Sequence, residues 1–212
     1  MSRGGWGASD FTHMSSLQVT IAGEQFDHLL YHFVLTHSNW EYVMVCFAEN
    51  FANLSTGMQN AFWELSGTPA HHRTDRLTLA VNADGQPEQF TARYQGLLDH
   101  YGVKGEATNA ASGHENGDCE QSHRRFKEAV EQALLLRGSR DFASRTEYEK
   151  FLRELAQRRN APRAEALQAE LAVLHELPAK RLETQERRRV RVRRGSWLRS
   201  GTRRTGWHRR RA

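Results

Sequence analysis

The feature that most limits the fold of this 212-residue sequence is a pair of apolar runs near its beginning. The first is Leu29–Leu35 and the second covers residues 40–47. Both are rich in β-branched and aromatic residues, which is typical of largely buried strands. Only residues 36–39 separate the two runs, and a connection this short joins antiparallel neighbours. The sequence therefore predicts a buried antiparallel strand pair.

The hydrophobic period changes on either side of this pair. Upstream, Leu17, Val19 and Ile21 alternate with polar or small residues, which predicts a strand within residues 8–22 that ends at a turn around Gly23. Downstream, apolar residues recur every three or four positions, which predicts an amphipathic helix. These residues are Phe51, Leu54, Met58, Ala61, Phe62 and Leu65.

The second half of the chain alternates between short strands and helices. Residues 109–117 are rich in Asn, Ala, Ser and Gly and are expected to form a loop, after which Asp118 caps the next helix. This order predicts a mixed α/β sheet covered by helices. The expected segments are a short strand at 70–74, a helix from about 90 to 101, a short strand at 103–108, and helices at 118–137, 146–159 and 163–176.

Charge divides the chain into two unlike parts. From Arg187 onward there are twelve Arg and no Asp or Glu, whereas residues 1–186 hold 18 basic and 25 acidic residues. A basic segment is typical of a protein that binds nucleic acid. That inference applies to the tail alone, because the body of the chain is acidic.

Cysteine and apolar content argue against several classes of protein. The two cysteines, Cys46 and Cys119, form no CxxC pair, so a structural zinc site is not expected, and reduced cysteines fit a cytosolic protein. No run of about 18 apolar residues exists, which predicts no membrane span. The first residues lack the apolar core of a signal peptide.

Three carboxylates, each a weak signal alone, resemble a known arrangement when they are taken together. Asp10 stands in the first predicted strand, where Asp is disfavoured without a special purpose. Asp75 follows a short strand, and Glu120 stands at the beginning of a helix. With the residues around them, they resemble the catalytic core of DDE transposases and retroviral-type integrases, most closely the IstA-type transposases of two-gene insertion sequences. The matching segments are 8–14 (ASDFTHM), 32–41 (HFVLTHSNWE), 72–78 (HRTDRLT), 114–121 (HENGDCEQ) and 136–144 (LRGSRDFAS), within a resemblance that runs from about residue 6 to about residue 196.

The resemblance implies an RNase H-like fold and a two-metal active site. In such folds the first Asp lies on the central strand, the second at the end of the neighbouring strand, and the Glu on a helix packed nearby. Asp10 is expected to bridge two Mg²⁺ or Mn²⁺ ions, with Asp75 on one and Glu120 on the other. Hard cations prefer carboxylate oxygen, and a metal pair stabilises the entering and leaving oxygens of phosphoryl transfer. The implied activity is DNA strand cleavage followed by strand transfer.

The family also implies partners and a domain plan. The partners are the transposon ends and target DNA, further copies of the chain, and an AAA+ ATPase helper, in the bacterial cytoplasm at the nucleoid. Residues 1–145 are interpreted as the integrase-type catalytic core and residues 146–177 as a helical extension. Residues 178–212 are interpreted as a linker and basic tail, the remnant of a C-terminal β-rich domain.

Two choices near the third carboxylate remain open. Glu115 competes with Glu120, and we prefer Glu120 because the family resemblance places the catalytic Glu in the Gly-Asp-Cys-Glu step at 117–120. Geometry agrees, because the first turn of a helix holds a ligand more rigidly than a loop does. Arg124 and Lys127 share a helix face with Glu120 and are expected to contact DNA phosphates. The alternative is a solvated face on which these cations alternate with glutamates.

The ends of the chain depart from the family. The helix-turn-helix region that recognises element ends is expected to be missing, so we interpret the chain as an N-terminally truncated fragment. From Trp197 onward the sequence reads as a frameshift product; the alternative is a genuine Arg-rich arm that binds DNA. The leading hypothesis is thus a transposase core. Its rivals are an inactive remnant that acts as a DNA-binding or dimerising inhibitor and, third, an RNase H-like nuclease.

Overall fold

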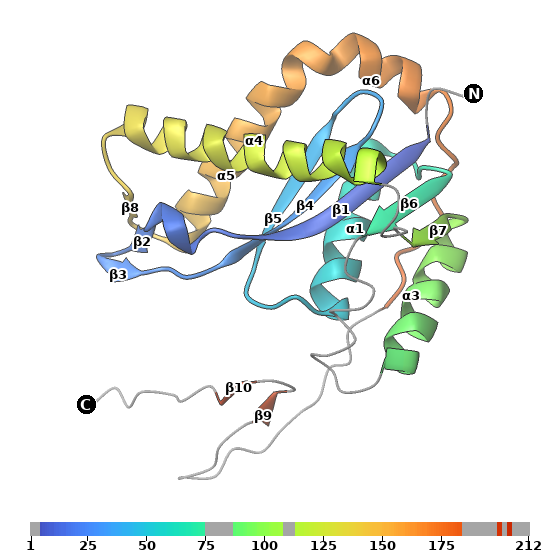
Figure 1. Ribbon diagram of the computed structural model, residues 1–212, viewed down its shortest axis with the longest axis horizontal. Helices are drawn as coiled ribbons and strands as arrows, with labels where there is room; N and C mark the ends of the chain where they lie inside the picture. The colour runs from blue at the N-terminus through green and yellow to red at the C-terminus, as the bar shows by residue number, and fades with distance from the viewer. Residues whose placement is uncertain (1–4, 75–86, 108–112, 184–198, 201–202, 205–212) are drawn as a thin grey trace.

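A five-stranded sheet with helices on both faces forms the body of the protein (Figure 1). The computed structural model describes residues 5–74, 87–107, 113–183, 199–200 and 203–204, with side chains for 5–74, 92–106 and 121–183. The strand order is β5-β4-β1-β6-β7, so β1 is central. The bounds are β1 Trp6–His13, β4 Leu29–Leu35, β5 Glu41–Cys46, β6 His71–Thr74 and β7 Lys104–Ala107.

Strand directions make this a mixed sheet. β1 pairs antiparallel with β4, and β4 pairs antiparallel with β5, which confirms the predicted strand pair. All seven residues of β4 are buried, as the run predicts, which is apolar except for His32. β6 pairs parallel with β1, and β7 pairs parallel with β6. The predicted fold class, an RNase H-like mixed sheet with antiparallel first strands and flanking helices, is confirmed by this topology.

Each face of the sheet carries its own hydrophobic core. Helices α1 (Phe51–Leu65) and α3 (Pro87–Tyr101) cover one face, which is called the α1 face below. Helices α4 (Gly113–Arg137) and α5 (Arg145–Asn160) cover the other face, which is called the α4 face below. Because side chains alternate along a strand, Phe11 of β1 points to the α1 face and its neighbour Asp10 to the α4 face.

Local capping explains where two predicted helices begin. The Asn50 side chain accepts a hydrogen bond from the Asn53 amide and opens α1, which confirms the predicted helix. Ser144 opens α5 in the same way through the Glu147 amide. The helix predicted at 146–159 is confirmed to within one residue at each end.

The predicted strand within residues 8–22 is wrong as one element. β1 ends at His13, a short 3-10 helix (η1, Ser15–Leu17) follows, and β2 (Thr20–Ile21) pairs with β3 (Glu24–Gln25). The alternating apolar residues Leu17, Val19 and Ile21 pack into the core on the α4 face. The expected turn is present, since Gly23 adopts a φ of 79° between β2 and β3.

Helix α4 begins at Gly113, five residues before the predicted start. The expected loop at 109–117 is therefore wrong from residue 113 onward, and Asp118 lies inside the helix instead of capping it. The buried stripe of Phe126, Val130 and Leu134 anchors the helix on the sheet. A helix held by packing over its second half continues into residues whose own helix propensity is weak.

The chain after the sheet returns to the same cores. α5 packs on the α4 face together with β4, β5 and α4. The predicted domain plan assigns this helix to a helical extension. The three predicted domain ranges stay a prediction. After a short 3-10 helix (η3, Ala161–Arg163), α6 covers Ala164–Leu171, shorter than the predicted helix at 163–176. β8 (Asp141–Phe142) pairs with β2, and the two-residue strands β9 (Arg199–Ser200) and β10 (Arg203–Arg204) pair with each other. None of the described helices is both long and apolar enough to cross a bilayer.

Candidate functional site

Asp10 lies at the middle of the sheet, on the α4 face of central strand β1. Its side chain is half-buried, and its Oδ1 accepts a hydrogen bond from the Phe11 amide at 2.7 Å. Its register partner on β4 is His32, and the side chains of such antiparallel partners lie side by side on one face. A half-buried carboxylate on a largely apolar face is a hard oxygen donor, which fits a ligand of Mg²⁺ or Mn²⁺.

The other two predicted carboxylates fall largely outside the described residues. Asp75 lies outside them, and it follows directly on Thr74, the last residue of β6, whose register partner is Ser9. Glu120 lies within the backbone range of α4, but its side chain is not described. The described side chains contain no group of three His, Cys, Asp or Glu residues that would hold a metal ion. The predicted metal ligand set therefore stays a prediction.

Two polar contacts attach α4 to the strands beside Asp10. The Nδ1 atoms of His123 on α4 and His32 on β4 are 2.7 Å apart, a hydrogen bond in which one ring donates and the other accepts. Four residues further along α4, Lys127 donates from Nζ to the carbonyl oxygen of His13 at 2.8 Å. α4 therefore runs in the same sense as β1, from the level of Asp10 towards the end of the strand.

A chain of buried polar groups extends from His32 across the α4 face. His32 Nε2 lies 3.2 Å from Glu41 Oε2, an ion-pair distance, although the contact does not have the geometry of a hydrogen bond. On its other side, Glu41 Oε1 accepts a hydrogen bond from Arg159 Nε at 2.5 Å, and Arg163 lies 3.5 Å away. His32 and Glu41 are each 1% exposed, and His123 is 7% exposed.

Burial and neighbouring charge set the ionisation of this buried chain. Burial alone would raise the pKa of the Glu41 carboxyl, but His32 and Arg159 more than offset it, so this pKa lies below its ordinary value. Burial is the main cause that lowers the pKa of His123 to about 2. His123 is therefore a neutral ring, and Glu41 is an ionised carboxylate.

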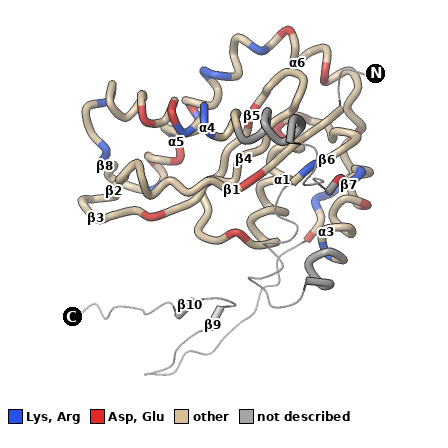
Figure 2. Tube along the Cα trace, viewed as in Figure 1, with Lys and Arg blue, Asp and Glu red and all other residues tan. Residues whose placement is uncertain are grey.

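Of the two predicted DNA-binding residues, Arg124 is exposed on α4 and Lys127 is half-buried beside β1. Arg124 Nε forms an ion pair at 3.6 Å with Glu128, and both side chains are largely exposed. Lys127 is turned towards the end of β1 by its bond to His13. Acidic and basic residues alternate along α4 and α5 (Figure 2), so the described part of these helices presents mixed charge and no single basic stripe.

A second buried polar chain crosses the α1 face behind Asp10. Ser9 Oγ lies 3.0 Å from His72 Nε2, and His72 Nδ1 lies 2.7 Å from the Tyr94 hydroxyl. His72 is completely buried, and burial lowers its pKa to about 3. This neutral imidazole ties β6, the strand that ends just before Asp75, to β1 and to α3.

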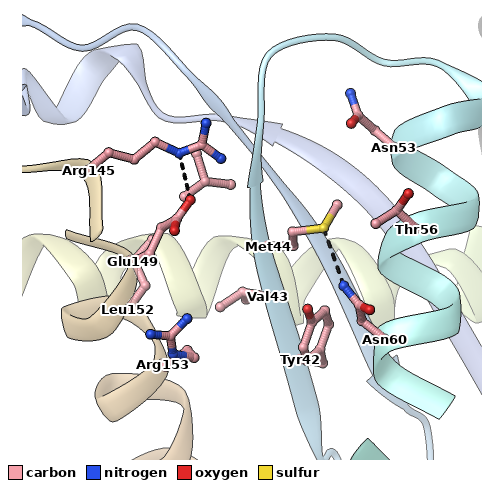
Figure 3. Close-up of a pocket in the computed structure, with 11 residues that line it drawn as sticks. Tyr42, Val43, Met44, Asn53, Thr56, Asn60, Arg145, Glu149, Leu152 and Arg153 are labelled. Atoms are coloured by element: carbon pink, nitrogen blue, oxygen red, sulfur yellow. Dashed lines mark hydrogen bonds and ion pairs between the residues drawn. The ribbon is translucent and has the colours of Figure 1, made fainter. Parts of the chain in front are cut away.

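A groove follows the outer edge of β5 between α1 and α5 (Figure 3). Asn53, Thr56 and Asn60 line it on one side, and Arg145 and Arg153 line it on the other. None of the predicted site residues whose side chains the structure describes lies in it. At one end of this edge the Asn160 side chain accepts from the Glu41 amide at 2.9 Å and donates to the Glu41 carbonyl at 2.8 Å. The Asn160 amide thus takes the place of a neighbouring strand at that position.

Sequence reasoning missed the buried polar chain near Asp10. His32 and Glu41 stand at the two ends of a segment that carries the family resemblance, but their spacing gives no sign that they meet. His123 lies 91 residues from His32, and Arg159 lies 118 residues from Glu41. The one available signal was the presence of ionisable residues inside apolar strands, which is rare without a partner.

Sequence similarity links this chain to a curated protein, although no family model matches it. It is 44% identical over 179 residues to the uncharacterized protein y4jA/y4nE/y4sE of Sinorhizobium fredii (strain NBRC 101917 / NGR234); the match covers 82% of this chain but only 35% of that protein. The chain therefore spans about a third of the length of the curated relative that it matches.

Similar solved structures are retroviral integrases. They include the HTLV-2 integrase catalytic core domain in complex with magnesium, with a TM-score of 0.42 and 18% identity over 61% of this chain and 70% of that one. The catalytic core domain of BIV integrase has a TM-score of 0.45 and 14% identity over 79% and 81% of the two chains. At scores this low the likeness adds nothing to the strand topology, on which the fold assignment rests.

Proposed function

We propose that this chain is the catalytic core of a DDE transposase of the IstA type, which cleaves and joins DNA strands with the help of divalent metal ions. The observation that carries the proposal is the position of Asp10 relative to β6. Asp10 lies on the central strand, and the parallel neighbour β6 ends at Thr74, the residue before Asp75. This is the strand arrangement that the family uses for its first two carboxylates.

The course of α4 supports Glu120 as the third carboxylate. Glu120 stands one turn before His123, which bonds to His32, the register partner of Asp10. It stands two turns before Lys127, which bonds to the end of β1, and positions seven apart in a helix differ by only about 20° around its axis. Position 120 is therefore on the flank of α4 that is turned towards β1.

Asp10, Asp75 and Glu120 would hold two Mg²⁺ or Mn²⁺ ions in this proposal. Such ions supply positive charge to the entering and leaving oxygens of an in-line phosphoryl transfer. The chain itself holds the Asp10 carboxylate in place. The Phe11 amide orients this carboxylate through a hydrogen bond, and the pairing of β1 in the sheet fixes the position of its backbone. Arg124 and Lys127 would contact phosphates of the DNA ends, which position the strand without reading its sequence.

Partners belong to the same proposal. The substrates would be transposon ends and target DNA, with further copies of this chain and an AAA+ ATPase helper completing the assembly. Support comes from the fold together with the family resemblance of the segments around Asp10, Asp75 and Glu120.

Strand cleavage and transfer on oligonucleotide duplexes that carry the element ends test the proposal. The full chain is assayed with Mg²⁺ or Mn²⁺ beside Asp75→Asn, which keeps the side-chain shape and removes the charge. We expect a loss on the order of 100-fold or more, because a metal ligand is removed. Asp99→Asn is the matched control, since Asp99 on α3 is bonded to Gln95 at an exposed site on the other face.

Two outcomes would overturn the proposal. Activity that survives Asp75→Asn would remove Asp75 from the active site. If the wild-type chain binds DNA but shows no metal-dependent cleavage, the transposase proposal fails and the chain is a DNA-binding inhibitor.

A further inference from the structure

The α4 face holds ionisable groups where an apolar core would be expected. Leu30, Val43 and Val45 of the sheet, together with the buried stripe of α4, form an apolar cluster. In the same layer, His32 and Glu41 are each 1% exposed. Burying charged groups is costly, and well-packed apolar residues in their place often give equal or greater stability. Stability alone therefore gives no reason for these residues.

The contacts of these groups connect separate elements in one line. Arg159 at the end of α5 bonds to Glu41 on β5, Glu41 pairs with His32 on β4, and His32 bonds to His123 on α4. The Asn160 amide holds the Glu41 backbone at the same place. Both nitrogens of the His32 ring are thus engaged, one by a carboxylate and one by the ring of His123.

Hydrogen bonds fix position in a way that apolar packing does not. The other described core contacts of α4 come from Phe126, Val130 and Leu134, and apolar contact has little directionality. The 2.7 Å bond between His123 and His32 depends on distance and angle, so it resists sliding and rotation of α4 over the sheet. Its place on the helix is one turn from position 120, and its place on the sheet is level with Asp10.

We propose that His123 and His32 are positioning residues, which hold the α4 segment around position 120 at the level of Asp10, with Glu41 and Arg159 orienting the His32 ring. The inference rests on the proposed function, because the site being positioned is the proposed metal site. The two histidines contact neither metal nor DNA in this account. Outer residues that orient metal ligands typically affect metal affinity or activity by about 10- to 100-fold.

Two substitutions of His123 separate positioning from filling of space. His123→Leu keeps much of the volume and removes the ring nitrogen that bonds to His32. His123→Asn is smaller but places an amide group, which can donate or accept, where Nδ1 stands, so it restores the bond to His32. Leu134→Ala is the control for lost stability, since Leu134 is 1% exposed on the same helix, further along its axis.

Two measurements on the full chain are compared across these variants. Mn²⁺ titration followed by calorimetry gives the half-saturation concentration without any need for catalysis. Hydrogen–deuterium exchange gives the protection of α4 amides 121–127 relative to amides 130–137. For His123→Leu we expect half-saturation to rise about tenfold or more and protection at 121–127 to fall. For His123→Asn we expect a return to within a few-fold of the wild type.

The results distinguish failure of the inference from failure of the proposed function. Positioning is refuted when His123→Leu leaves the Mn²⁺ half-saturation unchanged, or when Leu134→Ala raises it equally. A wild-type chain that binds no Mn²⁺, or an Asp10→Asn variant that binds it equally well, removes the proposed metal site. In that event the exchange data alone decide whether His123 holds α4: unchanged protection at 121–127 in His123→Leu refutes it.

Discussion

Replacing His72 by Gln should remove a defined part of the acid sensitivity of the fold. His72 is completely buried on β6, and Ser9 and Tyr94 occupy its two ring nitrogens. Burial lowers its pKa from 6.5 to about 3 in the folded chain. A glutamine amide can also donate and accept hydrogen bonds at this place, but it does not titrate.

The sign and size of the effect follow from proton linkage. Between pH 6.5 and about pH 3 the unfolded chain carries a proton on His72 that the folded chain does not. The stability contributed by neutral His72 is therefore complete above pH 6.5 and falls as the pH is lowered. The slope is about 1.4 kcal/mol per pH unit, so lowering the pH to about 5 costs about 2 kcal/mol through this residue.

Urea denaturation at about pH 7 and about pH 5, followed by circular dichroism, measures this difference. The loss of unfolding free energy between the two pH values should be about 2 kcal/mol smaller in His72→Gln than in the wild type. His37→Gln, which removes an exposed histidine, is the matched control and should leave the loss unchanged. Equal losses in wild type and His72→Gln would refute the reasoning, because His72 would then not be buried in its neutral form.

Three further substitutions test local packing and hydrogen bonding. Gly57→Ala in α1 should destabilise the fold by about 1–3 kcal/mol in spite of the higher helix propensity of Ala, because its Cβ would lie 2.2 Å from the buried Tyr31 ring. Gly96→Ala in α3, where nothing lies within 4 Å, should instead stabilise by about 0.5–1 kcal/mol, and thermal denaturation of both checks the contrast. Asn160→Leu should cost about 1–3 kcal/mol in urea denaturation by leaving the Glu41 backbone without its partner; no loss would mean that water satisfies this strand edge equally well.

The local hydrophobic pattern was sufficient to predict those elements in which the order of apolar and polar residues matches the order of buried and exposed positions. β4 is buried along its whole length and is apolar except for His32, and α1 shows a regular three- and four-residue period. The start of α4 could not be read in this way. Its first residues are weak helix formers, and the anchoring contacts of the helix come from the sheet, far away in sequence. Propensity favoured a loop there, and tertiary packing overrode it.

The candidate site likewise contains residues that the local sequence could indicate and residues that it could not. Asp10 stood out in the sequence because an Asp inside a strand conflicts with strand propensity, and its role as a metal ligand stays a prediction. The pair of His32 and His123 could not be predicted, because His32 interrupts an apolar strand but nothing in the local sequence identifies its partner on α4. Folding brings their rings together, because His32 on β4 and His123 on α4 are 91 residues apart in sequence.

The choice between Glu120 and Glu115 now depends on helical periodicity instead of capping. Because α4 begins at Gly113, both residues lie in the helix, and the rigidity argument no longer separates them. They differ by about 140° around the axis. Glu115 shares the side of Phe126, over whose ring Arg159 of α5 lies, whereas Glu120 shares the side of Lys127, which bonds to β1. Strand transfer by Glu120→Gln should therefore fall by on the order of 100-fold or more, and that by Glu115→Gln by no more than about threefold. The reverse result would assign the third carboxylate to Glu115 and would mean that α4 turns its other flank towards Asp10.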